Sequence, residues 1–180
     1  MLPCARRLRL LLIAVLLALS PAAFAKGPIH SATWDVYFSP GGGAEGAVVR
    51  ALAEARGTVY VQAYSFTNAA IAKALVDAHK RGVVVEVILD KSTQTARYSA
   101  ATFTSNAGIP TAIDAKHAIA HNKIMIIDNA TVLTGSYNFT KAAEHSNAEN
   151  LIVLRDPDLA ARYMANWKVH RAHAALLSAH

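Results

Sequence analysis

The stretch His121–Asn138, HNKIMIIDNATVLTGSYN, decides the fold and holds the polar side chains on which a function can rest. Its run Ile124–Ile127 is apolar and mostly β-branched, as buried strands are. Asp128 and Asn129 are turn-forming residues, because their side chains support unusual backbone angles. Strand character resumes at Thr131–Thr134. We therefore predict a β-hairpin with its turn at residues 128–129.

Side chains alternate across a strand, so His121 and Lys123 should share one face of the hairpin. A loop of two or four residues would return Ser136 and Asn138 to that face, whereas an odd loop or a bulge would break this inference. Asp128 has the other parity and lies at the turn. We therefore expect Asp128 to be structural and not to touch a substrate.

Histidine, lysine, serine and asparagine on one face suit a phosphoryl group. The imidazole can act as a nucleophile or a proton shuttle near neutral pH, and the other three side chains donate hydrogen bonds to non-bridging oxygens. A metal is not expected on this face, because lysine is not a usual ligand and no second histidine or carboxylate lies close by. The alternative is a half-buried strand with incidental polar residues.

The pattern His121-x-Lys123-x4-Asp128-x6-Gly135-Ser136, completed by Asn138, resembles the HKD motif of the phospholipase D superfamily. The resemblance is closest to the small bacterial Nuc-type endonucleases. It extends to AYSFT at residues 63–67, IDAKHAIAHNK at 113–123 and GSYNFTKAAE at 135–144.

The chain holds one copy of the motif, which corresponds to one HKD half. A phosphohistidine mechanism needs a second histidine as general acid, so a homodimer with a shared site is expected, without metal or cofactor. The resemblance implies His121 as nucleophile, Lys123, Ser136 and Asn138 as substrate-binding residues, and a hydrogen bond from His121 to the Glu149 carboxylate that orients His121.

Nucleic acid is the expected substrate, with contacts to backbone phosphates and little readout of base sequence. Lys91 and Arg97 are candidates for such contacts, although a solvated surface role is the alternative. Two other functions stay open: a phospholipase D-type hydrolase that acts on a phospholipid phosphodiester, and a catalytically silent nucleic-acid-binding protein.

The first 25 residues are typical of a cleaved secretory signal. Three arginines precede the apolar run Leu10–Leu19, and Ala23-Phe24-Ala25 fits the cleavage rule. Ten apolar residues span only about 15 Å as a helix, so a retained anchor is the less favoured alternative. Cleavage would leave residues 26–180 as one phospholipase D-like domain, periplasmic or secreted, without cysteine, and would lower the net charge from +6 to +3 because three of the 18 basic residues are lost.

Elsewhere the chain alternates strand-like and helical segments, at residues 58–65, 68–81 and 83–89. This alternation predicts an α/β fold with a mixed, largely parallel sheet and helices on both faces. Asp156-Pro157 should begin a final helix. His117 and His121 are spaced for zinc on a helix, but strand character begins at His121, so His117 is expected to border the site or to bond a carbonyl. His170, His173 and His180 are expected at the surface.

Overall fold

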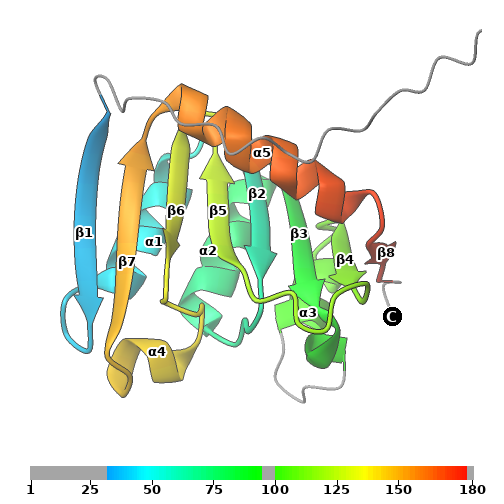
Figure 1. The fold of residues 1–180 in the computed structure, drawn as a ribbon, viewed down its shortest axis with the longest axis horizontal. Coiled ribbons are helices and arrows are strands. Elements are labelled where there is room, and N and C mark those ends of the chain that lie inside the picture. The colour runs from blue at the N-terminus through cyan, green and yellow to red at the C-terminus, as the bar shows by residue number, and fades with distance from the viewer. Residues whose placement is uncertain (1–31, 95–99, 178–180) are drawn as a thin grey trace, which may run out of the picture.

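The computed structural model describes residues 32–94 and 100–177, which form one eight-stranded sheet with helices on both faces (Figure 1). The predicted signal segment and Arg97 lie outside these residues. The strand order is β1-β7-β6-β5-β2-β3-β4-β8. The strands are β1 (Thr33–Ser39), β2 (Thr58–Ala63), β3 (Val84–Asp90), β4 (Thr111–Asp114), β5 (Lys123–Ile127), β6 (Thr131–Gly135), β7 (Glu149–Arg155) and β8 (Ala175–Leu176). The helices are α1 (Ala44–Glu54), α2 (Ala69–Lys80), the 3₁₀ helix η1 (Lys91–Gln94), α3 (Ala100–Asn106), α4 (Lys141–His145) and α5 (Pro157–Arg171).

The predicted mixed sheet between helices is confirmed, but parallel pairing is confined to β2, β3 and β4. The other five neighbouring pairs are antiparallel. The alternation of helix and strand covers only the parallel part, where a helix carries the chain back before each next strand. The connection between β5 and β6 is too short for such a crossover, so this half of the sheet is antiparallel.

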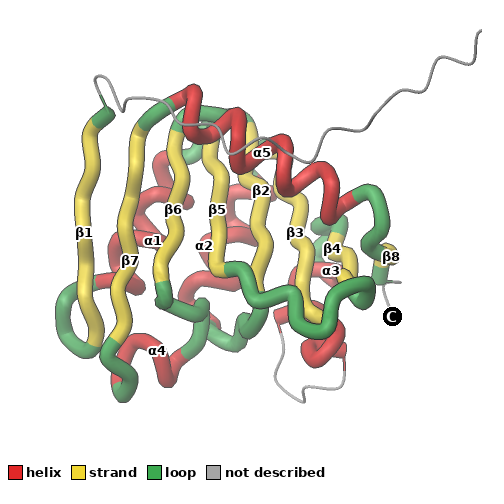
Figure 2. The backbone as a smooth tube through the Cα atoms, viewed as in Figure 1, coloured by secondary structure: helices red, strands yellow, loops and turns green. Residues whose placement is uncertain are grey.

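Two apolar cores cover the two faces of the sheet, and Figure 2 shows the helices that flank these faces. Helices α1, α2 and α3 pack on one face, where side chains such as Leu52 and Leu75 are fully buried. Helix α5 crosses the other face, and its Trp167 packs with Ile126. The indole Nε1 of Trp167 also donates a hydrogen bond to the carbonyl of Val61 over 3.0 Å. Among the residues that the structure describes, no helix has the length and apolar character needed to cross a bilayer.

Asp128 fixes the hairpin turn to the start of β2. Its carboxylate accepts hydrogen bonds from the backbone N–H groups of Arg56, Gly57 and Thr58, at 2.7–3.0 Å. Burial alone would raise the pKa of Asp128, but these donors and the Arg56 charge hold that pKa below its ordinary value. Asp128 therefore lies at the opposite end of β5 from Lys123, in a position that supports the fold.

Candidate active site

The polar residues of the hairpin gather at one edge of the sheet, where β5 begins, β6 ends and β7 begins. These three ends coincide because β6 is antiparallel to both of its neighbours. The pocket at this edge is lined by His121, Lys123, Gly135, Ser136, Asn138 and Glu149.

The condition of the parity argument, a loop of two or four residues, is not met. Ile127 pairs with Thr131, so the turn has three residues, and the same register places His121 level with Tyr137. Tyr137 is fully buried in the core. Ser136 and Asn138 nevertheless reach the pocket, because regular pairing ends at Gly135 and the backbone beyond it follows an irregular path.

Gly135 makes this close approach of β6 and β7 possible. Its φ is +152°, and a Cβ built on it would overlap the carbonyl oxygen of Asn150. Directly after it, the Ser136 hydroxyl oxygen accepts hydrogen bonds from Asn150 N and Nδ2, at 3.0 and 3.2 Å. Because these bonds occupy acceptor positions, the Ser136 O–H can still be donated into the pocket.

Lys123 is only 7% exposed and lies against His121. Its Nζ donates to the carbonyl of His121 over 2.9 Å and lies 3.1 Å from His121 Nδ1. The ring of Tyr64 completes the group, with its centroid 4.6 Å from that of His121 and 5.2 Å from Lys123 Nζ. Burial lowers the pKa of Lys123, and the charge of Glu149 offsets part of this effect.

Glu149 lines the pocket, but its partner differs from the one that the resemblance implied. Its Oε1 accepts a hydrogen bond from Asn147 Nδ2 over 3.0 Å, and no bond to His121 is present among the described residues. Asn138 has a buried Oδ1 without a hydrogen-bond partner in that part of the chain. An unsatisfied buried polar atom costs about 1–3 kcal/mol, so a group that enters the pocket can recover this free energy.

The remaining candidates lie elsewhere. The Nζ of Lys91 donates to the carbonyl of His117 over 3.1 Å, and Lys91 does not line the pocket. Arg97 lies outside the described residues. The prediction that His170 and His173 are surface residues is wrong, because their side chains are only 14% and 19% exposed and contact the buried Asp114. Sequence reasoning also missed Tyr64, although the quoted AYSFT segment contains it.

Comparison with known proteins gives one consistent family. Residues 48–170 match the model described as "Cardiolipin synthase, PLD-like domain". A phospholipase D of Rickettsia typhi is 41% identical over 135 residues, which make up 75% of this chain and 66% of that protein. The chain thus spans just under two thirds of the length of this relative.

Two further comparisons agree. The crystal structure of Nuc from Salmonella typhimurium, a phospholipase D family member, is 40% identical and superposes with a TM-score of 0.80, over 82% of this chain and 99% of Nuc. A mitochondrial cardiolipin hydrolase of Danio rerio is 34% identical over 109 residues, covering 60% of this chain and 48% of that protein.

Proposed function

Because the chain belongs to the phospholipase D superfamily of phosphodiesterases, we propose that it is an endonuclease that cleaves DNA or RNA without sequence specificity. The observation that carries this proposal is the pocket itself, in which His121, Lys123, Ser136 and Asn138 meet at one sheet edge. The likeness to Nuc supports the nuclease assignment, because it extends over 99% of that chain.

The chemistry proceeds in two displacements. His121 attacks phosphorus, the bond to the leaving oxygen breaks, and His121 of the partner subunit donates a proton to that oxygen. The partner's His121, now neutral, takes a proton from water, whose oxygen attacks phosphorus and releases the phosphate from His121. Lys123, Ser136 and Asn138 hold the non-bridging oxygens. No metal ion or cofactor takes part in either step.

Glu149 acts on the protonation of His121. When Lys123 is charged it can only donate, so its contact with Nδ1 leaves the imidazole proton on Nε2. A histidine that attacks through Nε2 needs the opposite tautomer, with its Nδ1–H donated to an acceptor. Glu149 is the carboxylate of the same pocket. When the second subunit completes the site, the Glu149 carboxylate releases its hydrogen bond from Asn147 and accepts the Nδ1–H of His121 instead.

The dimer is required because each chain supplies one motif histidine. An apolar surface beside the pocket offers a place for the second copy. Trp34, Val36 and Phe38 alternate along the edge strand β1 and are 62%, 43% and 60% exposed. They lie on the face of the sheet that α5 packs against, but α5 does not extend over β1 (Figure 1). Phe38 pairs with Asn150, whose Nδ2 donates a hydrogen bond to Ser136 Oγ of the pocket, so the surface borders the site on the Ser136 side.

A lipid phosphodiester is the second candidate. The reaction centre would be the same, and the Rickettsia relative is named a phospholipase D. We further propose that a signal is removed after Ala25 and that the product, residues 26–180, is periplasmic or secreted without a stable membrane anchor. The intact mass of the protein recovered from outside the cytoplasm tests this cleavage.

A plasmid-nicking assay in EDTA tests the main proposal, with His121→Ala as the inactive variant. His145→Ala is the matched control, because His145 is exposed on α4 and does not line the pocket. We expect nicking by the parent and by the control but not by His121→Ala. Cleavage of phospholipid with intact plasmid would select the lipid reaction. Salt-sensitive DNA binding without product from either substrate would select the silent binding protein.

A further inference from the structure

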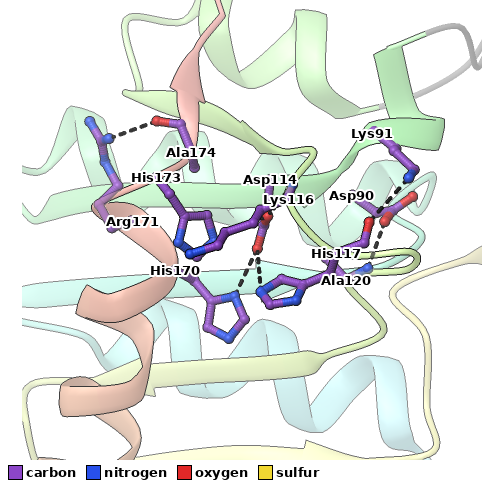
Figure 3. Close-up of polar contacts among 10 residues, drawn as sticks. All are labelled: Asp90, Lys91, Asp114, Lys116, His117, Ala120, His170, Arg171, His173 and Ala174. Carbon is purple, nitrogen blue, oxygen red and sulfur yellow. Dashed lines mark hydrogen bonds and ion pairs between the residues drawn. The ribbon is translucent and has the colours of Figure 1, made fainter. Parts of the chain in front are cut away.

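A second group of titratable side chains lies outside the pocket, around Asp114 at the end of β4 (Figure 3). Asp114 is fully buried, which is unusual for a carboxylate. Three histidines surround it: His117 from the loop after β4, His170 from the last turn of α5, and His173 from the segment between α5 and β8. The four residues come from two distant parts of the chain.

The geometry is that of a converging ligand set. His170 Nδ1 lies 2.7 Å from Asp114 Oδ2, His173 Nε2 lies 3.2 Å from Oδ1, and His117 Nε2 lies 3.9 Å from Oδ2. The centroids of the three rings are 5.0–5.5 Å apart. One donor atom from each residue lies within 4.8 Å of all the others. Ligands of a tetrahedral zinc ion, at about 2.0–2.1 Å from the metal, are about 3.4 Å apart, so the widest donor pairs would close and the 2.7 Å pair would lengthen when the ion binds.

Hydrogen bonds satisfy only part of this cluster: Asp114 is bonded by Lys116 N and His170 Nδ1, whereas His173 Nε2 is buried without a hydrogen-bond partner among the described residues. If all three imidazoles were protonated, one carboxylate would face three positive charges in a partly buried space. If they were neutral, each ring would offer only one N–H. A dication instead binds one lone pair from every neutral imidazole and balances the buried carboxylate. Three imidazoles and one carboxylate are ligands that suit zinc.

We propose that Asp114, His117, His170 and His173 bind one Zn²⁺ per chain. Four protein ligands close the coordination shell, so the ion is structural and not catalytic. It would fasten the loop at residues 115–122 to the end of α5. That loop is already held by contacts that include those from Lys91 Nζ to the carbonyl of His117 and from Ala120 N to Asp90 Oδ2. Because His121 lies in this loop, zinc would add to the contacts that position it, and these contacts hold the loop in the absence of the ion as well.

Measurement of metal binding tests this proposal. The sample is the purified full chain, prepared without a polyhistidine tag. After removal of metal with EDTA and of EDTA by dialysis, Zn²⁺ is titrated against a chromogenic competitor. We expect one equivalent to bind, and the affinity to fall at least about 100-fold in His170→Ala and in His117→Gln. His145→Ala is the control and should bind zinc as the parent does. The His117 side chain is 45% exposed, so its replacement is compatible with folding.

Cobalt gives a second measurement that does not depend on affinity. Co²⁺ in a four-coordinate site of nitrogen and oxygen ligands should show intense visible absorption, which the His117→Gln variant should lose. No saturable binding by the parent, or equal binding by the parent and His170→Ala, would overturn the proposal. Neither readout uses nuclease activity, and cleavage in EDTA is expected either way, so this proposal and the proposed function fail separately.

Discussion

Replacement of Gly135 by alanine should damage both stability and activity, because of two separate effects at one position. The first is conformational: φ is +152°, where an L-residue is strained by about 1–3 kcal/mol. The second is steric: the new methyl group would overlap the carbonyl oxygen of Asn150 and would lie 3.0 Å from its carbonyl carbon. Relief of this overlap requires β6 and β7 to move apart, at a cost of about 1–3 kcal/mol for overpacking.

The two effects together predict a loss of about 2–6 kcal/mol in the free energy of unfolding. The displacement falls where Ser136 and Glu149 enter the pocket, and a misplacement of about 1 Å in a catalytic group can lower the rate about 100-fold. Urea denaturation measures the first quantity. Plasmid nicking measures the loss of activity, in the absence of urea and at a temperature at which the variant is folded.

Gly82→Ala separates the two effects. Gly82 also has a positive φ, of +93°, but a Cβ there would meet nothing within 4 Å. It should therefore lose only the conformational part, about 1–3 kcal/mol, and should nick plasmid at the parent rate. If Gly135→Ala were as stable and as active as Gly82→Ala, the close approach of β6 to Asn150 would not be what shapes the pocket.

Three further changes test other parts of the molecule. Val36→Glu should shift the protein from dimer to monomer in analytical ultracentrifugation and reduce nicking in proportion, whereas Val84→Glu, at a valine on β3 that is 52% exposed, should leave a dimer. Asp128→Asn should lower the free energy of unfolding by about 1–2 kcal/mol at pH 7. The folded pKa of Asp128 lies below 3.8, so the carboxylate stabilises the fold above that pH. In acid-denaturation curves, the difference in stability between variant and parent should therefore disappear as the pH falls through the folded pKa. Trp167→Ala should cost about 3–5 kcal/mol in thermal or urea unfolding, because the ring is 4% exposed and ties α5 to the sheet.

The sequence predicts the strands and helices well where periodicity is strong. It indicates the turn at Asp128 and the polar residues of the pocket, because these lie within 29 residues of one another, from His121 to Glu149. The sequence does not predict the register of the hairpin, because no local residue pattern shows that Ala130 belongs to the turn. One extra turn residue reverses which side chains of β6 share a face with those of β5. The balance of parallel and antiparallel pairs fails for a similar reason, since it depends on which strands become neighbours.

The zinc ligands were beyond sequence reasoning. Asp114 and His117 form one close pair and His170 and His173 another, but 56 residues separate Asp114 from His170. Only the path of α5 across the sheet brings the end of β4 to the end of α5. Each histidine alone is typical of a solvated surface. The buried carboxylate between them becomes visible only when the tertiary fold is known.

Under the proposed mechanism, the pocket of a single chain is incomplete. Lys123 faces His121 Nδ1, and Glu149 is bonded to Asn147, so the acceptor that the reactive tautomer requires is engaged elsewhere. Asn150 pairs with the exposed Phe38 and Glu149 pairs with Ser39, at the end of the surface assigned to the second copy. A subunit that docks on this surface would lie beside the strand end that holds Glu149. It could release the carboxylate of Glu149 toward His121 in the same event that supplies the second histidine. Activity would then depend on dimerisation in two ways, through the general acid and through the tautomer of the nucleophile.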